Sequence, residues 1–246
     1  MATLKVEILS QEGALLKYEA SLKVRSGNLS IQVEGPLADS PRTYDIVLGG
    51  CPKCAHPGID SADTMDCSTC RLWTALDRAI ALGEYVRKGK SPLSEDILRA
   101  KQAYNKAYAY ALGVSLAVFM KELHKELLKA TYVVPVPWGS IGESQVTYHH
   151  EKAIARAFAK ATDMLFRDDF LQADSPERMV GKGYAERVEL AQKKIHGKNI
   201  QLNGSNILVI DDILTTGSTL DRCAYELKRM GASTVTGLVL ARTGNR

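Results

Sequence analysis

The chain has no long apolar run and little net charge, and both absences restrict what it can be. No stretch of its 246 residues approaches the length of a membrane span. Residues 1–7 alternate apolar and polar side chains and lack the core of a signal peptide. The formal net charge of +4 permits nucleic acid or phosphorylated ligands without requiring either. We therefore expect a cytoplasmic globular protein of one to two domains.

Two common nucleotide-binding signatures are also missing. A Walker A loop needs a lysine directly before its Ser or Thr, and no lysine lies between Ile207 and Thr219. No G-x-G-x-x-G pattern follows a predicted strand, so the dinucleotide-binding fingerprint fails as well. A kinase or ATPase function therefore loses its main support.

What is present is a strand, an acid pair and a small-residue loop in direct succession. The apolar run 207–210 suits a strand of a parallel sheet covered on both faces. Asp211 and Asp212 follow at the strand end, outside which ligands of such sheets bind, and we expect both carboxylates to be solvated there. The next loop offers N–H groups and hydroxyls at a helix start, which is an anion site. Its residues are Thr215, Thr216, Gly217, Ser218 and Thr219.

Residues 207–219 resemble the phosphoribosyl pyrophosphate (PRPP) motif of type I phosphoribosyltransferases. The resemblance implies that Asp211 and Asp212 bind the 2- and 3-hydroxyls of the ribose, directly or through Mg²⁺. It also implies that the loop 215–219 holds the 5-phosphate. The alternative is an ordinary strand–turn–helix corner with two solvated acids.

Four of the five cysteines form two C-x-x-C pairs, Cys51 with Cys54 and Cys67 with Cys70. Two such knuckles can supply four thiolates to one tetrahedral zinc ion. Without a secretion signal, disulfides are not expected. A zinc site with four protein ligands is structural. A redox pair or unrelated thiols are the alternatives, and we expect His56, inside the loop, to be a surface residue.

The chain divides into four regions by pattern. The pattern of residues 1–49 predicts short antiparallel strands at 4–9, 29–34 and 44–48. Residues 50–72 form the predicted zinc ribbon. Residues 73–130 predict helices, with Gly113 as a break or bend in one of them. An apolar stripe places a first helix over Leu72, Ala75, Leu76, Ile80 and Leu82.

The last region, 131–246, alternates strands and helices, which predicts a parallel sheet with helices on both faces. The expected strands cover 132–137, 170–171, 207–210 and 235–240, and the expected helices cover 151–166 and the segment from 219 to Gly231. The predicted fold class is therefore α/β, with a phosphoribosyltransferase-like parallel sheet, a preceding zinc ribbon and an N-terminal β-rich segment.

The order of these parts resembles the ComF-type competence phosphoribosyltransferases, over about residues 50–246. The similar parts are the ribbon, the helix around 97–104, Val134–Pro137 and 238–243. The family implies a pentosyl-transferring glycosyltransferase that uses PRPP and Mg²⁺. It also suggests contact with single-stranded DNA or a protein partner. Whether the chain forms a homo-oligomer is left open by the sequence.

One loop departs from the family pattern. The loop after the first strand contacts pyrophosphate in this class and is usually basic, whereas residues 138–150 contain no Lys or Arg. Its candidate contacts are Trp138, Gly139 and Ser140. His149 and His150 either replace the missing charge in part or cap the next helix, and the basic stretch 178–187 is another source of charge. The hypotheses are thus an enzyme, or a non-catalytic PRPP- or nucleotide-binding or DNA-handling factor.

Overall fold

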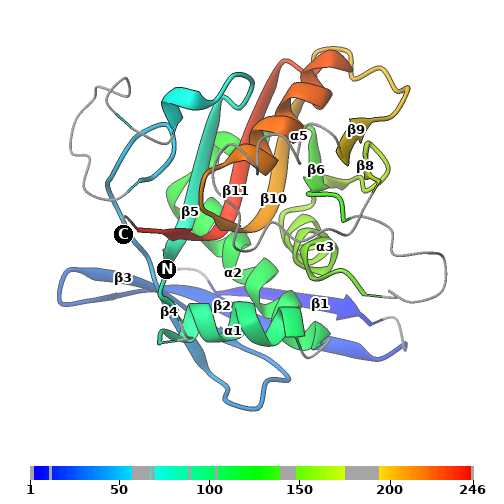
Figure 1. Ribbon diagram of the computed structural model, residues 1–246. Helices are drawn as coiled ribbons and strands as arrows, with labels where there is room; N and C mark the ends of the chain where they lie inside the picture. Colours follow the sequence, from blue (N-terminus) through cyan, green and yellow to red (C-terminus); the bar gives the residue numbers. More distant parts are fainter. Residues whose placement is uncertain are drawn as a thin grey trace.

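The computed structural model describes residues 3–10, 13–56, 67, 70–87, 90–102, 105–138, 148–174 and 194–244. Its centre is a five-stranded sheet in which every neighbouring pair is parallel (Figure 1). The strand order is β5 (Arg78–Tyr85), β11 (Thr234–Thr243), β10 (Asn206–Leu214), β6 (Tyr132–Pro135) and β7 (Leu165–Phe166).

Both faces of this sheet are covered, which confirms the predicted α/β class. Along β10, Leu208 and Ile210 belong to a core shared with the helices, and Ile207 and Val209 belong to a second core on the other face. The first face meets α1 (Pro92–Gln102), α2 (Lys106–Leu123) and α3 (His150–Thr162). The second face meets α5 (Ser218–Arg229) and the cysteine segment. The all-apolar strand is explained by this double burial.

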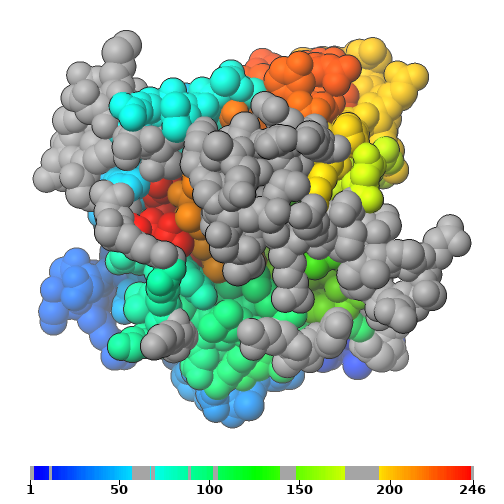
Figure 2. Space-filling view, in the orientation of Figure 1, coloured from blue at the N-terminus to red at the C-terminus, as the bar shows by residue number. Residues whose placement is uncertain are grey.

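The N-terminal residues form an antiparallel sheet, as expected, but it has four strands because 15–25 was missed as a strand. Its strands are β1 (Leu4–Leu9), β2 (Leu15–Arg25), β3 (Asn28–Glu34) and β4 (Arg42–Asp45). Alternate residues such as Tyr18, Ile31 and Val33 are buried in one core with α1, α2 and α3. The helical layer therefore lies between the two sheets (Figure 1). Figure 2 shows the N-terminal strands, in blue, at one end of the molecule.

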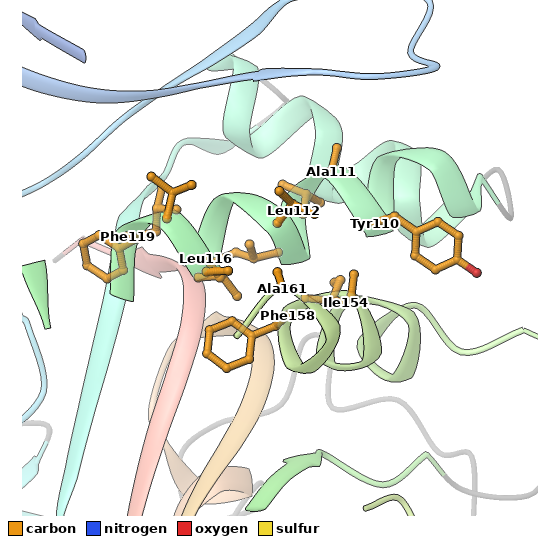
Figure 3. Close-up of a cluster of buried hydrophobic side chains, with 14 of the residues drawn as sticks. Tyr110, Ala111, Leu112, Leu116, Phe119, Ile154, Phe158 and Ala161 are labelled. Carbon is orange, nitrogen blue, oxygen red and sulfur yellow. The ribbon is translucent and has the colours of Figure 1, made fainter. Parts of the chain in front are cut away.

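Gly113 does not break α2, so the expected break is wrong. It lies inside the helix, and a Cβ added there would overlap the Ile154 carbonyl oxygen of α3. The missing side chain therefore lets the two helices approach closely. Figure 3 shows the resulting contact, with Leu112 and Leu116 of α2 near Ile154 and Phe158 of α3.

Other expectations were wrong in detail. The stripe assigned to a first helix contains β5, because Ala79–Leu82 is buried on both faces and such a run has no strand-like alternation. The expected helix to residue 166 ends at Thr162 and is followed by β7. The expected strand at 170–171 belongs to a separate two-stranded sheet, β8 (Leu171–Ala173) with β9 (Ile195–Gly197). Cys70–Leu72 and Lys125–Lys129 form short 3-10 helices.

Within the described ranges, no helix is both long enough and apolar enough to cross a membrane.

Candidate functional site

The acid pair lies where β10 extends past its neighbour β6. The last β10–β6 pair is Ile210 with Pro135, whereas β10 continues to pair with β11 as far as Leu214. Asp211 and Asp212 therefore lie beyond the end of β6 but inside β10, which ends at Leu214 and not at residue 210 as expected. Asp211 lies two residues after Val209 and four after Ile207. Since alternate residues of a strand face the same side of the sheet, Asp211 lies on the face that α5 covers.

Asp212 is not solvated, contrary to expectation, because it is only 5% exposed. Its Oδ2 atom contacts the ammonium group of Lys101 in α1 and lies 2.9 Å from Nε2 of His150 in α3. Its Oδ1 atom accepts the N–H of Ile213 at 2.6 Å. The same His150 nitrogen lies 3.0 Å from Oε1 of Glu151. Three elements thus converge on one buried carboxylate.

The electrostatics of this cluster follow from burial and pairing. Burial raises the pKa of Asp212, but Lys101 and His150 outweigh it and hold that pKa well below its usual range. Burial lowers the pKa of His150, but its hydrogen bonds to Asp212 and Glu151 raise it to about 9. His150 is therefore an imidazolium at neutral pH, and its Nε2–H donates to the carboxylates. Burial and the charge of Asp212 raise the pKa of Asp211.

The small-residue loop forms the turn into α5. Gly217 precedes the helix at φ +78°, a left-handed conformation that favours glycine. The Thr216 and Ser218 hydroxyls lie 3.1 Å apart, and the Ser218 N–H donates to Thr216 Oγ1 at 3.4 Å. Thr215 is exposed, Thr216 and Thr219 are half-buried, and Gly217 and Ser218 are buried. The loop therefore sits at the positive end of a 12-residue helix dipole.

Trp138 lies at the same end of the sheet as the acid pair. Its ring centroid is 6.1 Å from those of both His149 and His150. His149 occupies the position before α3 but makes no side-chain capping hydrogen bond, so capping does not explain it. Gly139 and Ser140 lie outside the described residues, as does the basic stretch 178–187.

The four ribbon cysteines form one buried cluster, and each offers a sulfur within 4.8 Å of the others. All are free thiols, with 3.6 Å between the sulfurs of Cys51 and Cys70 and 3.5 Å between those of Cys54 and Cys67. A tetrahedral site with Zn–S bonds of about 2.3 Å separates its sulfurs by about 3.8 Å. The donor set and its spacing therefore fit a zinc ion.

Two neighbours complete the surroundings of the cysteines. His56 is buried rather than a surface residue, and its carbonyl accepts the N–H of Cys51 at 2.9 Å. Arg242 of β11 is buried near the sulfurs: burial lowers its pKa and the cysteine charges act in the opposite direction. Its guanidinium would offset part of the negative charge of a four-thiolate site.

Sequence reasoning missed Lys101 and Glu151 as members of the site. Two signals were available in the sequence. Lys101 directly follows Ala100, which is buried, and Glu151 directly follows two histidines. Neither signal indicates a contact with Asp212 or His150, because such contacts depend on how the helices pack against the sheet. His150, Glu151 and Asp212 each offer a ligand atom within 4.8 Å of the other two.

The fold and site define an α/β protein with an acid pair and a glycine turn into a helix at one end of a parallel sheet. No family model matches the chain. A 49-residue segment is 33% identical to a ribose-phosphate pyrophosphokinase of Thermococcus kodakarensis. That match covers 20% of this chain and 18% of the pyrophosphokinase, so the likeness is local.

Proposed function

We propose that this protein binds PRPP with Mg²⁺ and transfers the phosphoribosyl group to or from a nitrogenous base, with pyrophosphate exchange. The observation that carries the proposal is the unit formed by β10, the acid pair, the turn at Gly217 and α5. One short segment thus presents carboxylates for sugar hydroxyls beside a helix N-terminus for a phosphate. The local likeness to a ribose-phosphate pyrophosphokinase supports the same ligand class.

The proposed ligand groups are distributed over the segment. Residues 215–219 hold the 5-phosphate through backbone N–H groups and hydroxyls. Asp211 is half-buried, and we place it on the ribose hydroxyls. Asp212 is already held by Lys101 and His150, so it anchors those two cations beside the sugar. Trp138, Gly139 and Ser140 belong to the loop that we assign to the pyrophosphate side.

In the proposed reaction, a base nitrogen forms a bond to the anomeric carbon of the ribose. The bond from that carbon to the pyrophosphate oxygen breaks, and its electron pair leaves with pyrophosphate. Positive charge builds on the sugar in between, so catalysis rests on positioning and on nearby carboxylates. Bound Mg²⁺ would supply charge neutralisation for the leaving group.

We also propose that Cys51, Cys54, Cys67 and Cys70 bind one zinc ion. Four protein ligands leave no open position for water, so its role is structural. Reduced cysteines with such a role fit the cytoplasm.

One observation favours a second candidate, a non-catalytic PRPP- or nucleotide-binding or DNA-handling factor. Asp212 accepts contacts from Lys101, His150 and the Ile213 N–H, so its acceptor positions are largely filled. In addition, residues 138–150 offer no Lys or Arg to a leaving pyrophosphate.

Pyrophosphate release separates the two candidates. The full chain is incubated with PRPP, Mg²⁺ and a panel of nitrogenous bases, with and without single-stranded DNA, while PRPP binding is measured by calorimetry. Binding with base-dependent release supports the enzyme. Binding without release supports the non-catalytic factor. If PRPP does not bind, the enzyme and the PRPP-binding form of the second candidate both fail.

A further inference from the structure

The segment that follows the cysteine cluster packs directly on the proposed phosphate loop. Trp73 is buried, and its Nε1–H donates to the Thr216 carbonyl at 2.9 Å. A Cβ added to Gly217 would lie 2.5 Å from three atoms of the Trp73 indole. In Figure 2 the cyan surface of this segment lies beside the orange surface of α5. The indole therefore fixes one side of the turn.

Asp221, in the first turn of α5, makes a second connection. Its carboxylate accepts the N–H groups of Thr74 at 3.0 Å, Ala75 at 2.8 Å and Leu76 at 2.8 Å. It also accepts the Thr74 hydroxyl at 3.1 Å. Several donors on one carboxylate make a strong, directional junction. The segment 73–76 is thus attached to the loop and to the helix that the loop begins.

The other end of this segment is continuous with the cysteines. Trp73 N–H donates to the Cys70 carbonyl at 3.1 Å, and Arg71 N–H donates to the Cys67 carbonyl at 3.2 Å. The first knuckle is also tied to the sheet, because Ala79 N–H donates to the Lys53 carbonyl at 2.7 Å. A short 3-10 turn is all that separates the Cys70 sulfur from the indole.

The Trp73 contact sets the direction of one peptide group. In a planar trans peptide the C=O and the following N–H point in opposite directions. Since the Thr216 carbonyl points to the indole, the Gly217 N–H points to the opposite side of the turn. That N–H belongs to the group of amides that a phosphate at this helix N-terminus would use.

We infer that the four-cysteine cluster positions the phosphate loop through Trp73, so that metal occupancy of the cysteines sets the affinity of the loop for a phosphate monoester. The inference rests on the proposed function for the identity of the ligand, but not for the positioning itself. Trp73 acts here as a positioning residue, because it orients the Thr216–Gly217 peptide and does not touch the ligand.

Trp73→Phe provides the test, since phenylalanine keeps most of the ring and removes the N–H donor. The matched control is Leu72→Ala, which alters a 45% exposed side chain of the same turn. Three quantities are measured on the full chain: zinc content, hydrogen exchange of peptides covering 214–220, and the Kd for ribose 5-phosphate. Each is measured with and without removal of zinc by a chelator.

We expect Trp73→Phe to retain zinc, to exchange faster at 215–219 and to bind ribose 5-phosphate three- to tenfold more weakly, as the loss of one hydrogen bond predicts. Zinc removal from the wild type should produce the same two changes, and Leu72→Ala neither. Unchanged exchange at 215–219 in either Trp73→Phe or the zinc-free protein would overturn the inference. If the wild type does not bind ribose 5-phosphate, the proposed function fails, and the exchange comparison alone still decides the role of Trp73.

Discussion

Lys101 of α1 and Asp212 of β10 form an ion pair that joins the helical layer to the end of the motif strand. Asp212 is buried, and burial raises its pKa while Lys101 lowers it. Because an unpaired buried carboxylate is costly, the pair fixes where α1 meets the site. The acid pair is therefore asymmetric: Asp212 is paired with Lys101 and His150, whereas Asp211 accepts the Asp212 N–H and is the carboxylate that we propose for the ligand.

Lys101→Met should lower the free energy of unfolding by about 1–3 kcal/mol, because it leaves Asp212 with His150 as its remaining cationic partner. Urea denaturation measures the change. Lys5→Met is the control, since Lys5 pairs with Glu19 on the surface and such pairs contribute little. Equal stability of the two variants would contradict the ion-pair account.

His150 should make stability depend on pH in a defined window. The pKa of His150 is about 9 in the folded protein, against an ordinary value of 6.5 for histidine. Because this pKa is raised on folding, protonated His150 stabilises the folded state. The stabilisation is complete below pH 6.5 and is lost as the pH rises through 9. The advantage of wild type over His150→Gln should thus shrink by up to about 3 kcal/mol between pH 6 and pH 9.5. Denaturation at both pH values measures it, and an unchanged gap would show that His150 is not ion-paired.

Gly217→Ala should destabilise the protein by about 2–4 kcal/mol and weaken ribose 5-phosphate binding, because it adds a clash with Trp73 to a left-handed backbone. Gly204→Ala is the matched control: Gly204 has φ +76°, and no other group lies within 4 Å of a Cβ added there. It should cost only about 1–2 kcal/mol. Equal losses in thermal and denaturant unfolding would mean that the Trp73 contact adds nothing.

Cys51→Ser should reduce zinc content and lower the unfolding midpoint, because metal binding by four thiolates is coupled to folding. Metal analysis and thermal unfolding check this. Cys223→Ser is the comparison, since Cys223 is buried in α5 and is not one of the four cysteines whose sulfurs converge, so it should leave the zinc content unchanged. A well-folded wild type that contains no zinc would refute the assignment.

The sequence predicted the local parts of the site because their signals are local. The apolar run, the acids and the glycine turn specify β10 and α5 within one segment, and the C-x-x-C spacing specifies the cysteine cluster. The parallel sheet followed from the alternation of strands and helices.

The rest depends on contacts that residue order does not contain. The stripe in β5 fits a helix or a doubly buried strand, and only its pairing with β11 decides between them. Asp212 was expected to be solvated because nothing near it in sequence indicates Lys101 or His150. His56 was expected at the surface because its burial beside the cysteines is a tertiary effect.

Calorimetric titration of PRPP, with and without Mg²⁺, into the wild type and Asp211→Asn tests the central claim most directly. Asp211 is the suitable position because it is half-buried, whereas Asp212 supports the fold through Lys101 and His150. The account predicts Mg²⁺-dependent binding to the wild type and binding at least about tenfold weaker in the variant, a loss of about 1.4 kcal/mol. Inorganic phosphate should bind both proteins equally, because the turn at Gly217 is unaltered. Equal PRPP affinity of the two proteins, or no binding to the wild type, would contradict the account.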